Sequence, residues 1–348
     1  MNHDSTTQHS QQDAAAAHAA LSAEAAGHHA EANAHTGDIP PAEVFPHLLG
    51  ELGDHHGFYI FSFKVSNLPY ILYDKDTGLN IYTSPEKLEA DGKYTLHGGH
   101  PQRVSDGHHA AWDFSVTNFV AFQMLGLVIM FLLFKMAASK YKKNPLAAPR
   151  GFQNMLEALV MFIRDEVVRP NLPSLRIADR LTPYFLSLFF FILIMNLLGL
   201  VPGGHSATGA IGTTAALAIT TFIVVNYTAL KEAGIGAWLH HLLGGAPVYL
   251  APIMIPIEII GLFTKPFALT MRLFANMSAG HIILLSLIGL TFFFKSWGVV
   301  PVSVGFSVFI YFLEALVVFL QAYIFTMLSA VFVGLALGDH VHDEEHAH

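Results

Sequence analysis

The chain has 348 residues, of which 53% are hydrophobic and only 13% are charged, a composition typical of a membrane protein. A soluble fold is disfavoured, because it would have to bury several apolar stretches longer than an ordinary core helix. The net charge of −8 is uninformative as a total, whereas the absence of cysteine excludes disulfides, thiolate metal sites and thiol catalysis.

The N-terminal third of the chain is polar and acidic. Residues 1–113 hold 15 Asp or Glu, 5 Lys or Arg and 13 of the 21 histidines, whereas residues 135–180 hold 9 Lys or Arg against 4 acids. Because positively charged loops stay in the cytoplasm, we expect the N-terminus outside and the C-terminus inside. The first residues have no basic n-region and no apolar h-region, so no signal peptide is visible.

Composition divides this third into two parts. Residues 1–45 are rich in Ala, His, Gln and Glu and predict a disordered tail. Its irregularly spaced His28, His29 and His35 could bind zinc or copper, although a solvated tail without metal is the favoured interpretation. Residues 46–116 predict an extracytoplasmic extension, because FYIFSFKV and LPYILYDKDTGLNIYTS alternate apolar and polar residues. We expect a small β-rich or irregular module with DKDTG as a hairpin turn.

Residues 117–338 predict an all-α polytopic membrane domain with about five membrane helices. The first three spans are expected at 118–134, at about 183–201 and at about 209–230. Between the first two, GFQNMLEALVMFIRDEVVR repeats apolar residues at helical spacing opposite Gln153, Glu157 and Arg164. This segment is too polar to span a membrane and predicts an amphipathic helix on the inner surface.

The last two apolar segments, at about 250–294 and 302–337, are unusually long. As helices they would measure about 65 Å and about 50 Å, against a hydrocarbon core of about 30 Å. Only KSWGVVP separates them, and Pro266 need not end a helix when neighbouring helices satisfy the freed carbonyl. We therefore expect two long, tilted, antiparallel helices, followed by an acidic and histidine-rich cytoplasmic tail at 339–348.

The two long segments contain ionisable and amide residues. They are Glu258, Lys265, Arg272, Asn276 and His281 in the first segment, and Glu314 and Gln321 in the second. An arginine near mid-bilayer costs roughly 2.5 to 3.5 kcal/mol on insertion scales, so such groups usually line a path or face a partner. Glu258, Lys265 and Arg272 are spaced by seven residues and form one stripe along a helix.

Helix geometry also predicts a pair of side chains. Suppose that Arg272 and Gln321 lie at one depth on antiparallel helices. His281 is nine residues further outward than Arg272 and Glu314 is seven residues further outward than Gln321, so His281 and Glu314 lie at nearly one level. A histidine beside a carboxylate is suited to relay protons. The layout then indicates two polar half-paths separated by Arg272, whose guanidinium does not lose its charge.

Two other interpretations remain open at this point. The polar residues could form hydrogen bonds that only hold the helices together, as in a structural scaffold. The chain could instead be a stand-alone secondary transporter or channel in which Arg272 binds an anion, although no inverted repeat is visible. Nucleotide chemistry within the chain is disfavoured because it has no G-x-x-x-x-G-K-[ST] loop.

Three motifs closely resemble subunit a of the F-type ATP synthase, the stator channel subunit of its membrane sector. They are MRLFANMSAGH at 271–281, LEALVVFLQAYIFTML at 313–328 and MNLLGLVP at 195–202, and the resemblance covers about residues 110–340. It implies partners in a c-subunit ring, a b-subunit peripheral stalk, the catalytic sector through the complex, and membrane lipid. It also implies a multi-pass protein of the bacterial inner membrane, with no nucleic acid, no cofactor and no catalytic site of its own.

The resemblance implies a role for each candidate residue. Arg272 is similar to the essential stator arginine that faces the ring carboxylates, with Asn276 and Gln321 as its polar neighbours. His281 and Glu314 then belong with these two amides to the outer half-channel, and Glu258 and Lys265 to the inner one. Some family members have an aspartate where this chain has Gly199, and His205 in the following loop is a candidate substitute.

Overall fold

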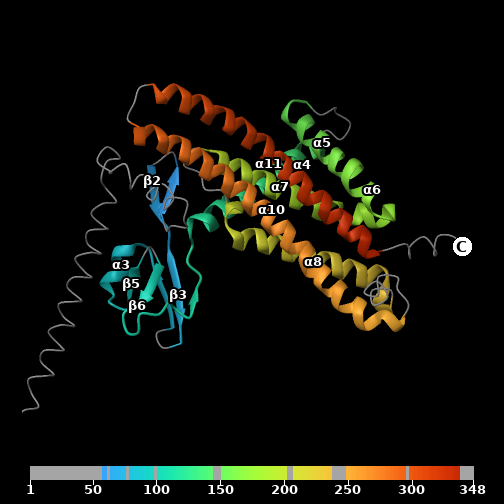
Figure 1. Ribbon diagram of the computed structural model, residues 1–348, viewed down its shortest axis with the longest axis horizontal. Coiled ribbons are helices and arrows are strands. Elements are labelled where there is room, and N and C mark those ends of the chain that lie inside the picture. Colours follow the sequence, from blue (N-terminus) through green and yellow to red (C-terminus); the bar gives the residue numbers. More distant parts are fainter. Residues whose placement is uncertain are drawn as a thin grey trace, which may run out of the picture.

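The computed structural model describes residues 57–60, 63–75, 78–97, 100–143, 150–201, 207–236, 248–294 and 298–337. Long helices form one body, and the strands form a module at one end of it (Figure 1). Among the described residues, five helices are long and apolar enough to cross a membrane, which confirms the predicted fold class. The expected tails at 1–45 and 339–348, with His28, His29 and His35, lie outside the described residues.

The N-terminal module is built from short antiparallel strands. They are β1 (Gly57–Ile60), β2 (Phe63–Asn67), β3 (Tyr70–Asp74), β4 (Gly78–Tyr82), β5 (Tyr94–His97), β6 (His100–Arg103) and β7 (Trp112–Asp113). They pair as β1-β2, β4-β3-β7 and β5-β6, so the predicted β-rich character is confirmed. Leu72, Leu88 and Tyr94 are fully buried in its core.

A short helix in this module was not expected from the alternating pattern. Helix α3 (Pro85–Ala90) begins after Ser84, whose side chain accepts a hydrogen bond from the Lys87 amide, and Pro85 occupies its first turn. Both features favour a helix start. The helix places Leu88 against the sheet, so one buried leucine joins α3 to the core.

The first membrane helix and the amphipathic segment lie where the sequence predicts them. Helix α4 (Asn118–Lys143) begins at the expected residue and continues through the basic KYKK. The amphipathic segment consists of α5 (Phe152–Phe162), the π-helical turn η1 (Ile163–Val168) and α6 (Arg169–Asn171). The Tyr141 hydroxyl donates to Glu157, 2.6 Å away, and so links the end of α4 to α5.

The second span begins earlier than predicted. Helix α7 (Leu175–Leu200) starts eight residues before Pro183, which lies inside the helix. Arg180, in this added part, forms an ion pair with Glu232 at the end of the next long helix, with 2.5 Å between Nη1 and Oε1. Charged residues can therefore extend the helix beyond its apolar part, because ion pairs stabilise them at the end of the bundle.

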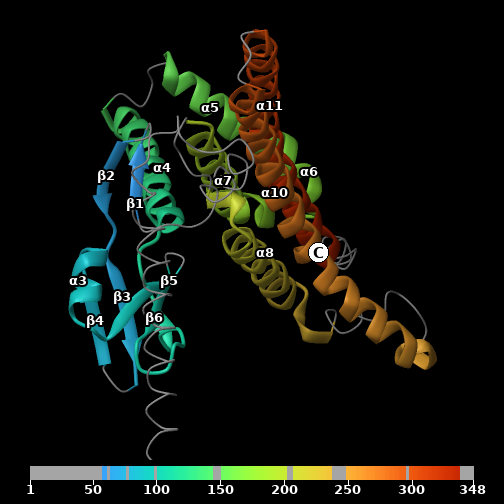
Figure 2. The same ribbon diagram turned by 60° about the vertical axis from the view of Figure 1, so that its left-hand side comes forward.

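The remaining membrane helices agree closely with the predicted spans. Helix α8 (Ile211–Glu232) follows the 3-10 turn η2 (Ala207–Gly209), and a second 3-10 turn, η3 (Val248–Leu250), precedes α10. Helices α10 (Ala251–Phe294) and α11 (Val299–Leu337) lie side by side in both views (Figures 1 and 2). Pro256 and Pro266 lie inside α10 without ending it, as expected for Pro266.

The end of α11 packs closely against α6. A Cβ atom added to Gly334 of α11 would overlap the backbone carbonyl oxygen of Asn171. Asn171 is itself fixed, because its side-chain amide donates to the Val167 carbonyl at 2.7 Å. Glycine at 334 thus permits the contact that holds the amphipathic segment on the last helix.

We expect Gly334→Ala to lower the stability of the chain by about 1–3 kcal/mol, because a backbone carbonyl cannot move away as a side chain can. Gly126→Ala is the control, since its added Cβ would meet the flexible Met195 side chain at 2.5 Å. Thermal unfolding in detergent, followed by tryptophan fluorescence, measures both. Equal melting temperatures for the two variants would contradict the proposed close contact.

Candidate functional site

The centre of the candidate site is Arg272 on α10. Arg272 and Asn276, one helical turn apart, are both exposed, whereas Gln321 on α11 is buried. Arg272 and Gln321 line the same shallow hollow, together with Leu269, Phe325 and Leu328. The two helices therefore bring the arginine and the glutamine to one hollow, in agreement with the common depth assumed for them in the sequence analysis.

His281 and Glu314 meet on the N-terminal-module side of Arg272. The Nδ1 atom of His281 lies 3.1 Å from Oε1 of Glu314 and 3.1 Å from the carbonyl oxygen of Met277. Glu314 is buried, with 6% of its surface exposed, and His281 is partly buried. The expected contact is present, and a buried carboxylate this close to an imidazole nitrogen is placed to exchange a proton with it.

Gly280 makes room for this pair. A Cβ atom at residue 280 would lie 2.7 Å from Oε1 and 2.9 Å from Cδ of Glu314. Glu314 thus packs directly on the backbone of α10 beside His281. The sequence analysis gave Gly280 no role, because its closeness to Glu314 depends on how α10 and α11 are packed.

In the proton-channel role that the resemblance of the motifs implies, we expect Gly280→Ala to reduce proton-driven activity by on the order of tenfold or more, because it displaces the Glu314 carboxylate from His281. Gly305→Ala on α11 is the matched control, since an added Cβ there has no atom within 4 Å. ATP synthesis by membrane vesicles measures the effect. If the two alanine variants were equally active, the close approach at Gly280 would be unimportant.

Further polar groups occur on α10 and α11 and on the elements packed against them, and they were not singled out as site residues from the sequence. The Thr208 hydroxyl of η2 donates to the buried Asn196 of α7. The Ser278 hydroxyl of α10 donates to the Gly209 carbonyl at 3.4 Å, and the Tyr311 hydroxyl of α11 donates to the Leu200 carbonyl at 3.0 Å. Four elements therefore contribute polar groups to the region around His281 and Glu314.

The expected departure at Gly199 falls in the same region. Gly199 is buried near the end of α7, three residues beyond Asn196. His205, the suggested substitute for an acid at this position, lies outside the described residues. Asn196 is the buried polar residue that α7 supplies here, and its burial could not be deduced from the isolated motif MNLLGLVP.

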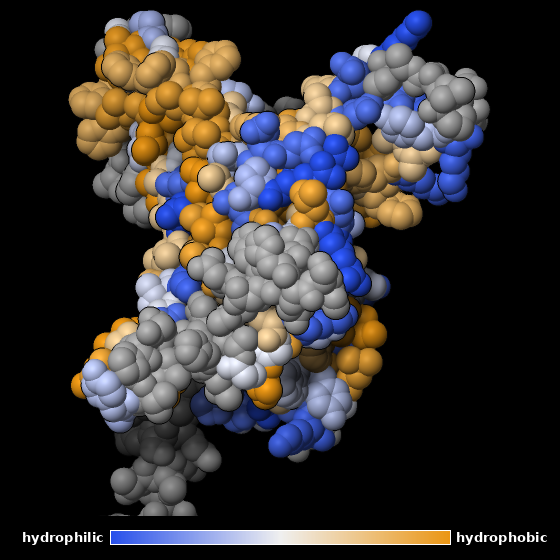
Figure 3. Space-filling model, turned by 90° about the vertical axis from the view of Figure 1, so that its right-hand side faces the viewer, coloured by the Kyte–Doolittle hydropathy of each residue, from blue (hydrophilic) through white to orange (hydrophobic). Residues whose placement is uncertain are grey.

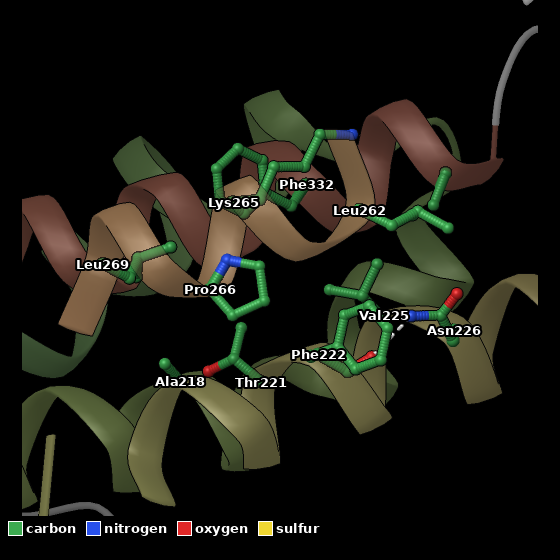
Figure 4. A pocket seen from close by; sticks show the side chains of 11 residues that line it. Ala218, Thr221, Phe222, Val225, Asn226, Leu262, Lys265, Pro266, Leu269 and Phe332 are labelled. Atoms are coloured by element: carbon green, nitrogen blue, oxygen red, sulfur yellow. Dashed lines mark hydrogen bonds between the residues drawn. The ribbon is translucent and has the colours of Figure 1, made fainter. Parts of the chain in front are cut away.

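A cavity that is open to solvent lies between α8, α10 and α11, on the side of Arg272 away from His281. Figure 4 shows Thr221, Phe222 and Asn226 of α8 across the cavity from Pro266 of α10. Lys265 also lines it, with its ammonium nitrogen 5.8 Å from the centre of the Phe332 ring. This contact keeps a cation beside a mainly apolar cavity.

Glu258 lies two turns before Lys265 on α10 and is partly buried. It is not among the residues that line the described cavity. Glu258, Lys265 and Arg272, spaced by seven residues, thus lie along one continuous helix. Glu258 and Lys265 are partly buried, whereas Arg272 is exposed.

Charged residues gather at the end of the helical body that lies farthest from the β-module. Arg169 pairs with Asp165 and with Asp179, each at 2.9 Å, and Arg164 pairs with Asp165 at 2.8 Å. The hydrogen bond from Arg164 holds the pKa of the Asp165 carboxyl below its usual range. Figure 3 shows a hydrophilic band between apolar surfaces in the view onto this end.

The surface of α10, in contrast to that charged end, is mainly apolar, and the rest of the chain leaves a large part of it uncovered. Within its most apolar window only 17% of residues are buried. The exposed side chains include Ile253, Ile257, Ile260, Phe263 and Phe267. Arg272 and Asn276 lie further along this poorly covered helix and are themselves exposed, so the polar groups face outward from the bundle.

The fold and the polar groups together define a multi-pass membrane protein with charged side chains built into two long adjacent helices. The family of the ATP synthase A chain matches residues 120–334, which include all seven candidate residues. The chain belongs to this family. The predicted resemblance to subunit a of the F-type ATP synthase is thereby confirmed.

Curated relatives agree with this assignment. ATP synthase subunit a of Chloroherpeton thalassium is 46% identical over 282 residues, covering 76% of this chain and 81% of the relative. ATP synthase subunit a of Chlorobium phaeobacteroides is 44% identical over 320 residues, covering 90% and 84%. ATP synthase subunit a of Myxococcus xanthus is 42% identical over 257 residues, covering 74% and 83%. The Chlorobium match therefore extends into the N-terminal third.

Proposed function

We propose that the chain is the proton-translocating stator subunit of an F-type ATP synthase. In this proposal two half-channels lead to and from the carboxylates of a c-subunit ring. The observation that carries it is the exposure of Arg272 on α10, between the His281–Glu314 contact on one side and the Lys265 cavity on the other. Two polar regions are thus separated by a guanidinium that keeps its charge.

The outer half-channel runs past His281 and Glu314 to Asn276 and Gln321. A proton that reaches Glu314 or His281 passes along polar side chains to a ring carboxylate and neutralises it. The neutral carboxyl group can then move into lipid as the ring turns, because only the charged form is strongly disfavoured there. Asn276, which is exposed next to Arg272, is suited to contact the ring at this step.

The inner half-channel contains Glu258 and Lys265 and the cavity between α8, α10 and α11. A ring carboxyl group that returns from lipid releases its proton here. The ionised carboxylate is then attracted by Arg272, whose charge also prevents protons from passing directly between the two half-channels. Net proton flow thereby requires rotation of the ring, which couples the flow to ATP synthesis in the catalytic sector.

The ring is the partner that best fits the uncovered surface of α10. That surface combines exposed isoleucines and phenylalanines with Arg272 and Asn276, so it suits a partner that is apolar apart from one carboxylate at the depth of the arginine. The b-subunit peripheral stalk holds the chain against the turning ring. The catalytic sector is reached through these subunits, and lipid surrounds the rest.

The proposed location is the bacterial inner membrane, with the N-terminal module outside and the C-terminus in the cytoplasm. The positively charged segment 135–180 supports this orientation, because positive residues remain on the cytoplasmic side. The ion pairs of Arg164, Arg169 and Arg180 lie at that same end of the helices. The amphipathic helix α5 is then on the inner surface.

Copurification and proton pumping test the proposal. We expect an affinity-tagged chain to copurify with a c-subunit ring and a peripheral stalk, and the purified complex in vesicles to acidify the interior when ATP is added, without added Na⁺. A pH-sensitive dye inside the vesicles reports the pumping. A chain that purifies alone and carries an anion across the vesicle membrane would instead identify a stand-alone transporter.

A further inference from the structure

The β4-β3-β7 sheet of the N-terminal module has two apolar faces. Its inner face contributes to the module core, where Leu72 is fully buried. On the other face, β3 pairs Tyr73 with Leu79 of β4 and with Trp112 of β7, so these three side chains form one row. The outward face is defined here by six residues, Ile71, Tyr73, Leu79, Ile81, Trp112 and Phe114.

The outward face is exposed although it is rich in large apolar side chains. Leu79, Trp112 and Phe114 are each 61% exposed and Ile81 is 60% exposed. The rings of Trp112 and Phe114 stack with their centres 6.2 Å apart, which adds a flat aromatic surface. A contiguous apolar patch on a module that already has a core marks an interaction surface.

The sheet is tied closely to the first membrane helix. The Ser115 hydroxyl accepts a hydrogen bond from the Ile71 amide at 3.1 Å, and the Val116 amide donates to the Pro69 carbonyl at 3.0 Å. Helix α4 begins at Asn118. Phe114 is four residues before Asn118, so the Cα of Phe114 lies within about 14 Å of the start of the membrane helix.

The apolar surface continues from the sheet onto that helix. Only 11% of the residues in the most apolar window of α4 are buried, so the rest of the chain leaves most of this apolar helix uncovered, as expected for a helix that contacts lipid. Its exposed apolar side chains begin at Val120, two residues into the helix, and continue with Met124 and Val128. A lipid-facing surface and the outward face of the sheet are therefore neighbours along the chain.

The module has a defined orientation relative to the membrane helices. In both views α3, which packs on the inner face of the sheet through Leu88, lies on one side of β3 and the membrane helices lie on the other (Figures 1 and 2). The outward face is thus turned to the side of the helices. Residues 57–116 hold 7 acidic and 5 basic residues, so their small net charge gives no strong attraction to anionic lipid.

We propose that the outward face of the β4-β3-β7 sheet docks on the lipid surface of the membrane, at the end of α4 that begins with Asn118. Trp112 and Tyr73 enter the headgroup region, where aromatic rings with a polar atom are favoured, and Leu79 reaches its apolar boundary. The attraction comes from apolar area rather than charge. Docking is independent of whether the chain moves protons.

Spin labelling tests the docking, and the absence of cysteine makes each introduced cysteine unique. Full-length chains with Leu79→Cys or the control Glu89→Cys are labelled with a nitroxide and reconstituted in phosphatidylcholine bilayers. Glu89 is exposed on α3, next to the core residue Leu88 on the opposite side of the sheet. We expect the label at 79 to collide more with oxygen than with a water-soluble nickel chelate, and the label at 89 to show the reverse.

Other occupants of the face give different results. If neither oxygen nor the nickel chelate reaches the label at 79 and its spectrum shows spin–spin broadening, a second copy of the chain covers the face. If neither reagent reaches the label and the spectrum is not broadened, another protein segment covers it. Either result overturns the proposal. Nickel access at 79 equal to that at 89 would also overturn it. We further expect Trp112→Glu to increase nickel access at 79, and anionic lipid to leave the ratio of oxygen to nickel collisions of the Leu79→Cys label unchanged.

Discussion

Replacing Arg272 with lysine is expected to lower proton-driven ATP synthesis by roughly 100-fold or more while the complex still assembles. Lysine keeps the charge in water, but its ammonium can lose the proton when it is desolvated against the ring. It also lacks the planar fork with which a guanidinium can contact a carboxylate and an amide together. Gln321, which lines the same hollow as Arg272, would lose this shared geometry.

The experiment compares Arg272→Lys and Arg272→Ala with Arg176→Lys. Arg176 is exposed in the first turn of α7, well away from the hollow, and is a matched control for the same chemical change. ATP synthesis in membrane vesicles measures coupling, and the subunit content of the purified complex measures assembly. Normal pumping by an assembled Arg272→Ala complex would show that this arginine only stabilises the helices.

Much of the site follows from helix geometry. Once Arg272 and Gln321 are placed at one depth on antiparallel helices, the residue spacing brings His281 and Glu314 to one level. The structure has His281 beside Glu314, and Arg272 and Gln321 line one hollow. The reason is that a helix has a fixed rise and a fixed turn per residue. Residues on two continuous helices can therefore be compared without knowing the rest of the fold.

Other features depend on contacts that periodicity does not encode. Helix α7 begins at Leu175 because ion pairs accommodate charged residues before Pro183, and Asn196 is buried because η2 brings Thr208 to it. Gly280 matters only because Glu314 packs on it from another helix. The short helix α3 was missed since its start signals lie inside an alternating, strand-like stretch.

Exchanging His281 and Glu314 is expected to be less damaging than removing either residue. His281→Ala and Glu314→Ala should each lower ATP synthesis by on the order of 100-fold, because each leaves its partner without a group to exchange protons with. The double variant His281→Glu with Glu314→His retains an imidazole and a carboxylate at the same depth. We expect it to be about tenfold more active than either alanine variant, a difference of about 1.4 kcal/mol in activation free energy.

Gly280 makes the exchange a stricter test of the pair. In the native chain it allows Glu314 to lie against the backbone of α10, with a Cβ position only 2.7 Å from the carboxylate oxygen. The bulkier imidazole at residue 314 needs this space even more, so adding Gly280→Ala to the exchanged chain should remove the recovered activity. Synthesis rates of the single, exchanged and triple variants provide the comparison. If the exchanged chain were as inactive as both alanine variants, a proton relay between these two positions would be wrong.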